Sequence, residues 1–396
     1  MAKIMAVNAG SSSLKFQLLD MPAEKVITTG VIERIGMKDS IFSIKVNGEK
    51  INETSDIEHH GEAVTILLKK LIDFNIIQSF EEIEGVGHRI VHGGDVITDS
   101  CILDDKAVEL LESIIDLGPL HLPANITGVK AFKEVLPNVL HIGVFDTAFH
   151  VSMPEEAFLY AVPYEWYERY SVRKYGFHGT SHKYVSHRTA EILGKKPEEV
   201  NIIVAHLGNG ASLCAVKAGK SVDTTMGFTP LEGVPMGTRS GNIDPAIIEY
   251  MGIKKQKSVK EITNTLNKFS GYLGVSGISS DSRDVNDAAA KGNHRADLAI
   301  QIQAKRIADY IASYYVYMGG ADAIVFTAGI GENAPSTREN IINRLAVLGV
   351  KIDRERNNCR GIERLISTDD STIKVFVVPT NEEVMIARDT LRLTHQ

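Results

Sequence analysis

Short stretches rich in glycine, serine and asparagine follow apolar segments at three places in this chain. They are Asn8–Ser13, His206–Ser212 and Gly329–Asn333. Glycine lets backbone N–H groups approach an anion closely, and serine and asparagine add short hydrogen-bond donors. Lys15 follows the first stretch and adds a positive charge. Any one such turn is more often an ordinary hairpin or helix cap, but three of them at strand ends predict a phosphate-binding site.

Two arginines stand among glycines, in contexts that do not look helical. Arg89 lies within Gly85–Gly94, and Arg239 lies within Gly233–Pro245. The arginine fork matches carboxylate and phosphoryl oxygens bidentately, and in phosphoryl transfer it neutralises the charge of the transferring group. A structural ion pair stays an equal alternative for each arginine taken alone.

A histidine and an aspartate are further candidates for catalysis. His178 precedes a helix expected to begin near Ser181, so its imidazole could act beside a helix N-terminus, although a buried core histidine is the alternative. The spacing of His178 and His182 resembles that of metalloproteases, but the glutamate of H-E-x-x-H is missing and a zinc site is not expected. Asp146 ends a predicted buried strand, where a catalytic carboxylate is often placed.

Other familiar motifs fit less well. Cys214–Ser221 misses the P-loop pattern at its first glycine, and G-x-S-x-G, the serine hydrolase pattern, does not occur. Ala328–Ala334 fits G-x-G-x-x-A, with Asp353 about 20 residues beyond, as in dinucleotide-binding folds. A nicotinamide oxidoreductase is therefore an alternative, although it leaves the other two glycine-rich stretches unexplained.

Short apolar segments alternate with amphipathic ones, which predicts a mixed α/β fold to position these residues. The expected strands are Lys3–Val7, Leu14–Leu19, Val26–Ile35, Ile41–Val46, Val139–Phe145, Asn201–His206, Leu213–Val216 and Ala323–Ala328. The expected helices are Glu62–Phe74, Asp105–Leu117, Pro123–Leu136, Arg295–Met318 and Glu382–Leu393.

The two halves of the chain resemble each other. Ile4–Phe16 and Ile203–Val216 share a strand, a small-residue turn, Ser-Leu and a second strand, and Val144–His150 resembles Val325–Gly331. Self-similarity at half length suggests a duplicated domain whose two copies face each other. The boundary is expected near Phe149–Pro154.

Composition limits the class of protein. A chain of 396 residues with 43% apolar and 23% charged residues is expected to form two packed domains. Its net charge of −7 argues against nucleic-acid or anionic-membrane partners. Three cysteines without a C-x-x-C pair suggest neither disulfides nor thiolate zinc. Without a signal peptide or a long apolar run, a soluble cytoplasmic protein is expected.

The motifs taken together closely resemble the acetate kinase family, in order and over nearly the whole chain. They are VNAGSSSLKF, GHRIVHGG, VFDTAFH, KYGFHGTSH, HLGNGAS, MGFTPLEGV, MGTRSGNIDP, FTAGIGEN and PTNEEVMIARD. The resemblance implies an α/β fold of two duplicated actin-like ATPase (ribonuclease H-like) domains with a nucleotide cleft between them. It places the first domain at residues 1–148 plus 382–396 and the second at residues 149–381.

The resemblance also implies roles for particular residues. The implied catalytic residues are Asp146, His178 and Arg239, and the substrate-binding residues are Arg89, Val91, Leu120, Phe177 and Pro230. The implied metal ligands are Asn8 and Glu382. The implied nucleotide-binding residues are Ser11, Ser13, Lys15, His206, Leu207, Gly208, Asn209, Gly210, Asp281, Ser282, Arg283, Gly329, Ile330, Gly331, Glu332 and Asn333. Ser282 and Leu122 depart from residues common in the family, which affects local packing rather than chemistry.

The implied activity is reversible, Mg²⁺-dependent, in-line transfer of the γ-phosphoryl group of ATP to acetate, giving acetyl phosphate and ADP. Mn²⁺ is expected to substitute for Mg²⁺, and a homodimer is expected. Because acetate is already ionised at neutral pH, Asp146 has no proton to remove and is expected to orient metal-bound water. The alternatives are a propionate or butyrate kinase of the same family, or an actin- or chaperone-like ATPase, against which Arg89, Arg239 and the small apolar pocket argue.

Overall fold

The chain folds into two compact units, each with its own sheet. The computed structural model describes residues 1–119 and 121–396. Unit 1 comprises Met1–Phe149 and Asn381–Gln396, and unit 2 comprises His150–Thr380.

Unit 1 is built on an eight-stranded sheet with the order β5-β4-β3-β2-β1-β6-β8-β7. Strands β1 to β5 pair antiparallel in succession, whereas β1, β6 and β8 run parallel. The strands are β1 Ala2–Gly10, β2 Ser13–Met21, β3 Lys25–Glu33, β4 Ser40–Val46, β5 Glu49–Ser55, β6 Ile83–Ile90, β7 Cys101–Ile102 and β8 Leu140–Phe145. The helices are α1 His60–Asp73, α2 Asp105–Ser113, α3 Leu122–Val135 and α15 Glu382–Thr394.

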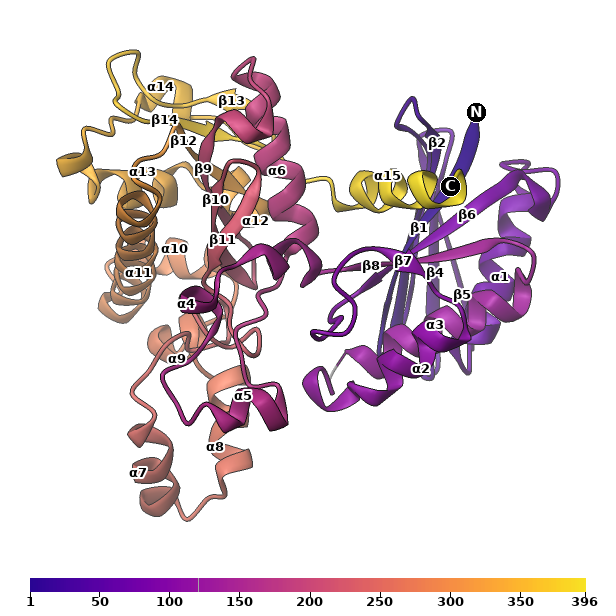
Figure 1. Ribbon diagram of the computed structural model, residues 1–396, viewed down its shortest axis with the longest axis horizontal. Helices are drawn as coiled ribbons and strands as arrows, with labels where there is room; N and C mark the ends of the chain where they lie inside the picture. Colours follow the sequence, from indigo (N-terminus) through magenta and orange to yellow (C-terminus); the bar gives the residue numbers. More distant parts are fainter. Residues whose placement is uncertain (120) are drawn as a thin grey trace. The chain divides into compact units, whose positions relative to one another are not determined.

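The central strand of unit 1 is buried on both faces. Met5 and Val7 of β1 belong to the core cluster that α1 and α3 complete, while α15 lies over the other face (Figure 1). The apolar residues of α1 recur at helical spacing, from Ala63 to Leu71, which turns one stripe of that helix to the sheet. A strand covered on both faces requires the near-continuous apolar run that its sequence shows.

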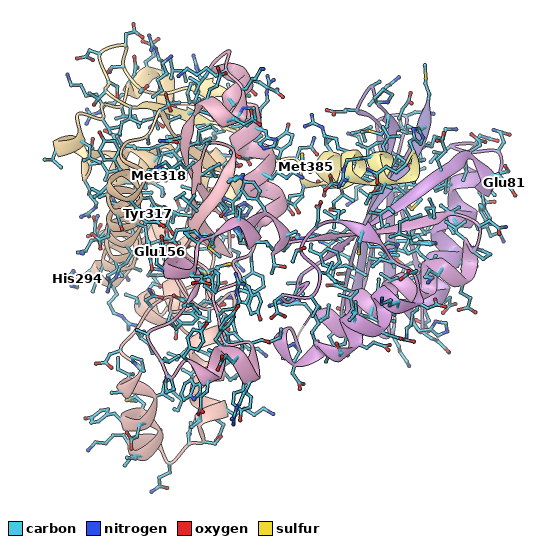
Figure 2. All side chains as sticks on the ribbon, in the orientation of Figure 1. Glu81, Glu156, His294, Tyr317, Met318 and Met385 are labelled. Atoms are coloured by element: carbon cyan, nitrogen blue, oxygen red, sulfur yellow. The ribbon has the colours of Figure 1, made fainter. Side chains whose placement is uncertain are left out.

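Unit 2 is built on a six-stranded sheet with the order β11-β10-β9-β12-β14-β13. The strands are β9 Asn201–Leu207, β10 Ala211–Lys217, β11 Lys220–Thr224, β12 Ala323–Thr327, β13 Arg364–Leu365 and β14 Lys374–Val377. The helices are α4 Glu155–Phe158, α5 Glu165–Tyr170, α6 Gly179–Ile192, α7 Ala246–Lys255, α8 Val259–Lys268, α9 Gly271–Ser276, α10 Ser282–Ala290, α11 His294–Met318, α12 Ala328–Asn333, α13 Pro335–Asn343 and α14 Arg354–Asn357. Figure 2 labels His294 and Met318, the two ends of the long α11.

The two sheets repeat one topology. In unit 1, the strands β3, β2 and β1 pair antiparallel, β1, β6 and β8 pair parallel, and the edge strand β7 pairs antiparallel with β8. In unit 2, likewise, β11, β10 and β9 pair antiparallel, β9, β12 and β14 pair parallel, and the edge strand β13 pairs antiparallel with β14. The duplicated α/β fold expected from the half-length similarity is therefore confirmed, and β4 with β5 extends the first copy.

Some local expectations were wrong. The stretch Gly329–Asn333 is not a loop but most of the short helix α12, and the preceding strand ends at Thr327 rather than at Ala328. Strands β1 and β2 pair as far as Gly10 and Ser13, so most of the first glycine-serine stretch is strand and not turn. In the described residues no helix has the length and apolar character needed to cross a membrane.

Candidate functional site

Polar residues collect at one edge of the unit 1 sheet, where its parallel strands end. Asn8 lies near the end of β1 and pairs across the hairpin with Lys15 of β2. Arg89 lies near the end of β6, opposite Val144 of β8, and Asp146 follows β8 directly. The carboxyl ends of parallel strands are the usual place for ligands in open α/β sheets.

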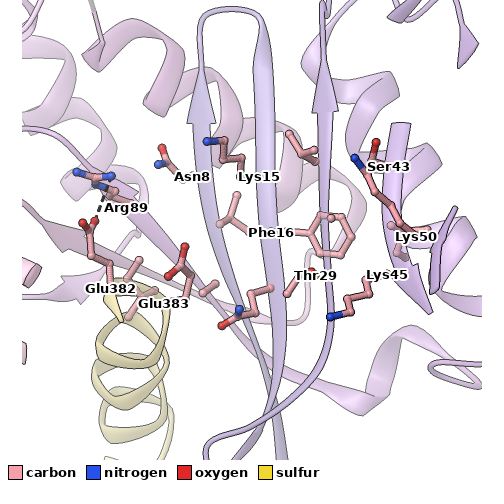
Figure 3. Close-up of a pocket in the computed structure, with 17 residues that line it drawn as sticks. Asn8, Lys15, Phe16, Thr29, Ser43, Lys45, Lys50, Arg89, Glu382 and Glu383 are labelled. Carbon is pink, nitrogen blue, oxygen red and sulfur yellow. Dashed lines mark ion pairs between the residues drawn. The ribbon is translucent and has the colours of Figure 1, made fainter. Parts of the chain in front are cut away.

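A partly buried arginine and two carboxylates form the centre of this edge. Arg89 donates from Nε to Asp146 Oδ1 at 2.9 Å and from Nη2 to Asp146 Oδ2 at 2.8 Å. Its Nη1 lies 3.1 Å from Oε2 of Glu382, the first residue of α15 (Figure 3). Burial lowers the pKa of Arg89, but the two carboxylates outweigh this and hold that pKa above its usual value. Burial raises the pKa of Glu382, and Arg89 opposes that rise.

A pocket of about 550 Å³ opens beside this arginine within unit 1. Asn8, Lys15, Arg89 and Glu382 line it together, and in Figure 3 the lysine and the asparagine extend from neighbouring strands. Asn8 and Glu382 offer the amide and carboxylate oxygens that Mg²⁺ prefers. Among the described residues there is no cluster of three or more His, Cys, Asp and Glu suited to a metal.

An asparagine that sequence reasoning missed as a site residue connects two of these strand ends. Asn125 of α3 donates from Nδ2 to the carbonyl of Ala9 at 2.8 Å, and its Oδ1 accepts from the backbone N–H of Val91 at 3.0 Å. It thereby fixes the ends of β1 and β6 relative to each other. The apolar context of α3 gave no sign of this bridge. Leu120, expected to line the substrate pocket, lies outside the described residues.

In unit 2, two of the expected catalytic side chains lie against one glycine. A Cβ atom added at Gly210 would lie 3.4 Å from Arg239 Nη1 and 3.6 Å from His178 Nε2. Arg239 also approaches the carbonyl of Pro230 at 3.4 Å and the sulfur of Met236 at 3.7 Å. Among residues 1–119 and 121–396 no carboxylate pairs with Arg239, and burial lowers its pKa. This guanidinium is therefore placed to receive an anion.

His178 is held in an unusual backbone conformation. Its φ of 58° is left-handed, which costs a residue other than glycine about 1–3 kcal/mol and often marks a functional position. Its ring stacks on His206, the penultimate residue of β9, with centroids 4.2 Å apart. The residue before His178 is also fixed, because the carbonyl of Phe177 accepts a hydrogen bond from Nε2 of His150 at 3.0 Å.

A second pocket of about 670 Å³ lies at the ends of β9 and β12, within unit 2. It brings together half of the expected nucleotide-binding set: Gly208, Asn209, Asp281, Ser282, Arg283, Gly329, Ile330 and Asn333. Ser280, Ala334 and Arg360 also line it and were missed, although Ala334 ends the G-x-G-x-x-A match and Ser280 directly precedes Asp281; no motif surrounds Arg360. The other members of the expected set in unit 2 do not line this pocket, although they lie at the same strand ends or in α12. They are His206, Leu207, Gly210, Gly331 and Glu332. Ser11, Ser13 and Lys15 belong to unit 1.

Two acidic residues of unit 2 have their carboxylates engaged locally. Glu332 Oε1 accepts from the backbone N–H of Ala328 at 2.8 Å and of Thr380 at 3.2 Å, so it joins α12 to the end of unit 2. Asp353, which the dinucleotide-binding alternative needs for a ribose, caps α14 and pairs with Arg356. In the pocket itself, the Arg283 side chain lowers the pKa of Asp281 to about 2.

The repeated α/β topology and the glycine-lined pocket at the strand ends of unit 2 fit a phosphotransferase built of two duplicated domains. The model of the acetokinase family matches residues 3–388. The chain belongs to the acetokinase family. It is 59% identical over 394 residues to the acetate kinase of Shouchella clausii, covering 100% of both chains.

Solved structures agree with this assignment. The acetate kinase of Porphyromonas gingivalis is 44% identical, with a TM-score of 0.95 over 99% of this chain and 100% of that one. A propionate kinase from Francisella tularensis is also 44% identical, with a TM-score of 0.93 over the same shares. This chain is therefore a kinase, and ATP and Mg²⁺ are the co-substrate and ion expected of its family.

Proposed function

We propose that this protein is an acetate kinase, which transfers the γ-phosphoryl group of ATP reversibly to acetate in one in-line step. The observation that carries the proposal is the pairing state of two partly buried arginines. Arg89 has carboxylate partners, whereas Arg239 has none among the described residues, so each is suited to a different anion. Phosphoryl transfer from ATP to a carboxylate brings two anions together, and cations that neutralise their charge favour the reaction.

The acid is proposed to bind at Arg89. An arginine carries five N–H donors, and Asp146 accepts from two of them, one on Nε and one on Nη2. Glu382 adds an ion pair at Nη1, and the N–H groups of the terminal nitrogens that Asp146 does not use are proposed to hold the carboxylate of the acid. Asp146 and Glu382 fix the plane of the guanidinium, so an incoming acetate meets a receptor already oriented. Val91, Leu120, Phe177 and Pro230 are proposed to enclose its methyl group.

The nucleotide is proposed to occupy the pocket of unit 2. Gly208 and Asn209 would approach the phosphates, while His178 and Arg239 would donate to the transferring phosphoryl oxygens. This positions cationic and N–H donors where charge develops, which is the main source of catalysis in phosphoryl transfer. Lys15, Ser11 and Ser13 of unit 1 are proposed to contact the phosphates during transfer.

Magnesium is proposed to be held through Asn8 and Glu382, with Mn²⁺ as a substitute. The ion would neutralise phosphate charge, and Asp146 is proposed to orient metal-bound water rather than to act as a base, because acetate has no proton to give up at neutral pH. A homodimer and a cytoplasmic location, both typical of the family, complete the proposal.

The test is an assay of ADP release coupled to trapping of acetyl phosphate as hydroxamate. We expect both products in equal amounts and only when acetate, ATP and Mg²⁺ are all present. ADP release without acetate would instead indicate an actin- or chaperone-like ATPase. Comparing kcat/KM for acetate, propionate and butyrate decides the alternative that the Francisella structure raises, since one methylene changes binding by about 1–3 kcal/mol.

A further inference from the structure

A chain of buried hydroxyl and imidazole groups lies behind His178. Ser212 of β10 is wholly buried and lies opposite His206 in the β9–β10 ladder. Its Oγ lies 2.9 Å from Nδ1 of His178 and 2.8 Å from Nε2 of His182. One hydroxyl thus joins the ring of His178, which lies beside the nucleotide loop 208–210 between β9 and β10, to the ring of His182, which has no role in the proposed reaction.

Only one tautomer of His182 leaves no buried N–H group without a hydrogen-bond acceptor. It is fully buried, and burial, with smaller effects from His150 and His206, holds its pKa well below the usual value, so the ring is neutral. Among the described residues its Nδ1 has no hydrogen-bond partner. A buried N–H without an acceptor is rarer than an acceptor without a donor, so the single proton belongs on Nε2, where Ser212 accepts it.

The direction of the next bond then follows. A serine hydroxyl has one proton to donate, and Ser212 already accepts from His182. Its proton is therefore donated to Nδ1 of His178, which must be unprotonated to accept it. The proton of a neutral His178 is consequently on Nε2, the nitrogen that lies against Gly210 beside Arg239.

We propose that Ser212 and His182 are positioning residues that fix the tautomer of His178, so that its Nε2–H always points to the nucleotide loop as a donor. Without Ser212, both tautomers would be populated, and the one with a bare Nε2 lone pair would repel a phosphoryl oxygen. This inference rests on the proposed function for its kinetic consequence, but the tautomer itself is a property of the unliganded protein.

The kinetic test compares three variants of the full-length enzyme. For Ser212→Ala we expect kcat to fall about 10- to 100-fold, the usual effect of removing a group that orients a site residue, with KM for ATP and acetate nearly unchanged. Ser212→Thr, which restores the hydroxyl, is expected to recover most of kcat. The matched control is Ser221→Ala, because Ser221 is also buried and bonded to a histidine, His150, but does not contact His178.

A spectroscopic test is independent of activity. In long-range ¹H–¹⁵N spectra of the wild-type protein, assigned with His178→Gln, we expect Nδ1 of His178 to resonate as an unprotonated nitrogen and Nε2 as a protonated one. In Ser212→Ala both ring nitrogens of His178 should resonate between the unprotonated and protonated positions, because the two tautomers interconvert. A protonated Nδ1 in the wild type would overturn the inference, as would a loss of kcat in Ser212→Ala no greater than in Ser221→Ala. If the wild type made no acetyl phosphate, the proposed function would fail, while the spectrum would still decide the tautomer.

Discussion

At the scale of single residues, the two arginines that looked alike in sequence have different surroundings. Arg89 is bound bidentately by Asp146 and is also close to Glu382, whereas Arg239 contacts a carbonyl and a sulfur and pairs with no carboxylate in the part of the chain that the structure describes. A cation that is partly buried without a counter-ion is destabilised until an anion arrives. Arg239 is therefore the residue whose interaction should strengthen most as charge develops on the transferring group.

Replacing this unpaired cation should slow the chemical step. We expect Arg239→Ala to lower kcat by about 10³, the scale found for arginines that act on the transition state, with a small change in KM for ATP. Steady-state kinetics with both substrates measure this directly. An unchanged kcat with a raised KM would mean that Arg239 binds ATP in the ground state only.

Replacing the paired arginine should instead weaken binding of the acid. Lysine keeps the charge of Arg89 but loses the planar fork, so Arg89→Lys should raise KM for acetate at least about tenfold while KM for ATP changes little. Arg188→Lys is the matched control, because Arg188 forms an equally bidentate but exposed pair with Glu363. Equal effects on the two KM values would contradict a role specific to the acid.

At the scale of elements, the sequence predicted what depends on local pattern. The apolar runs placed β1, β9 and β12 correctly, and the amphipathic period placed α11. It missed β5, whose residues are almost all exposed, because an edge strand held only by pairing with β4 needs no apolar alternation.

Contacts between residues far apart in sequence could not be predicted in this way. Family resemblance located the glycine-rich strand ends, but not Arg360, which reaches the nucleotide pocket from a segment without a motif. The shared hydroxyl of Ser212 was likewise hidden, since it depends on α6 packing against β9 and β10. Such bridges follow from tertiary packing, which no short pattern records.

The loop that carries Arg239 docks on the nucleotide loop through a glycine. Gly237 donates its N–H to the carbonyl of Asn209 at 3.1 Å, and a Cβ added there would lie 1.9 Å from Asn209 Oδ1 and 2.9 Å from the carbonyl of Ser280. Gly237→Ala must therefore displace a residue that lines the nucleotide pocket. We expect KM for ATP to rise about tenfold, a change of about 1.4 kcal/mol, and kcat to fall because Arg239 moves with the loop.

The control for this substitution is Gly61→Ala in the first turn of α1. There the added Cβ would lie 3.2 Å from Nδ1 of His59, which caps α1 by accepting from the backbone N–H of Glu62. Displacing this cap should lower stability by about 1 kcal/mol, but neither residue lines the nucleotide pocket, so both kinetic constants should be unchanged. A Gly237→Ala enzyme with wild-type KM for ATP would show that the two loops are not coupled.

At the scale of the whole molecule, one topology is used twice and supplies two different kinds of pocket. The copy in unit 1 places a paired arginine and carboxylates at its strand ends, and the copy in unit 2 places glycines and imidazoles there. Several imidazoles in each unit are buried and neutral. Burial lowers the pKa of His150 and of His92 to about 4, and those of His88 and His182 well below the usual value.

Buried neutral histidines make stability depend on pH in a definite direction. His150 has a pKa of about 4 in the folded protein, against 6.5 when exposed, so between these values the unfolded chain binds more protons. The contribution of His150 to the free energy of unfolding is complete above pH 6.5 and is lost as the pH falls towards 4. At pH 5 the loss is about 2 kcal/mol. We expect urea unfolding of the wild type to show at least this loss between pH 7 and pH 5.

His150→Gln should reduce that dependence on pH, since glutamine can still accept from Ser221 and donate to the carbonyl of Phe177 but does not titrate. The variant is expected to lose about 2 kcal/mol less than the wild type between pH 7 and pH 5 in the transition that reports on unit 2. His294→Gln, at the exposed start of α11, should leave the wild-type loss unchanged. A His150→Gln protein as sensitive to acid as the wild type would mean that His150 takes up its proton without unfolding, and that burial in this cluster tolerates the charge.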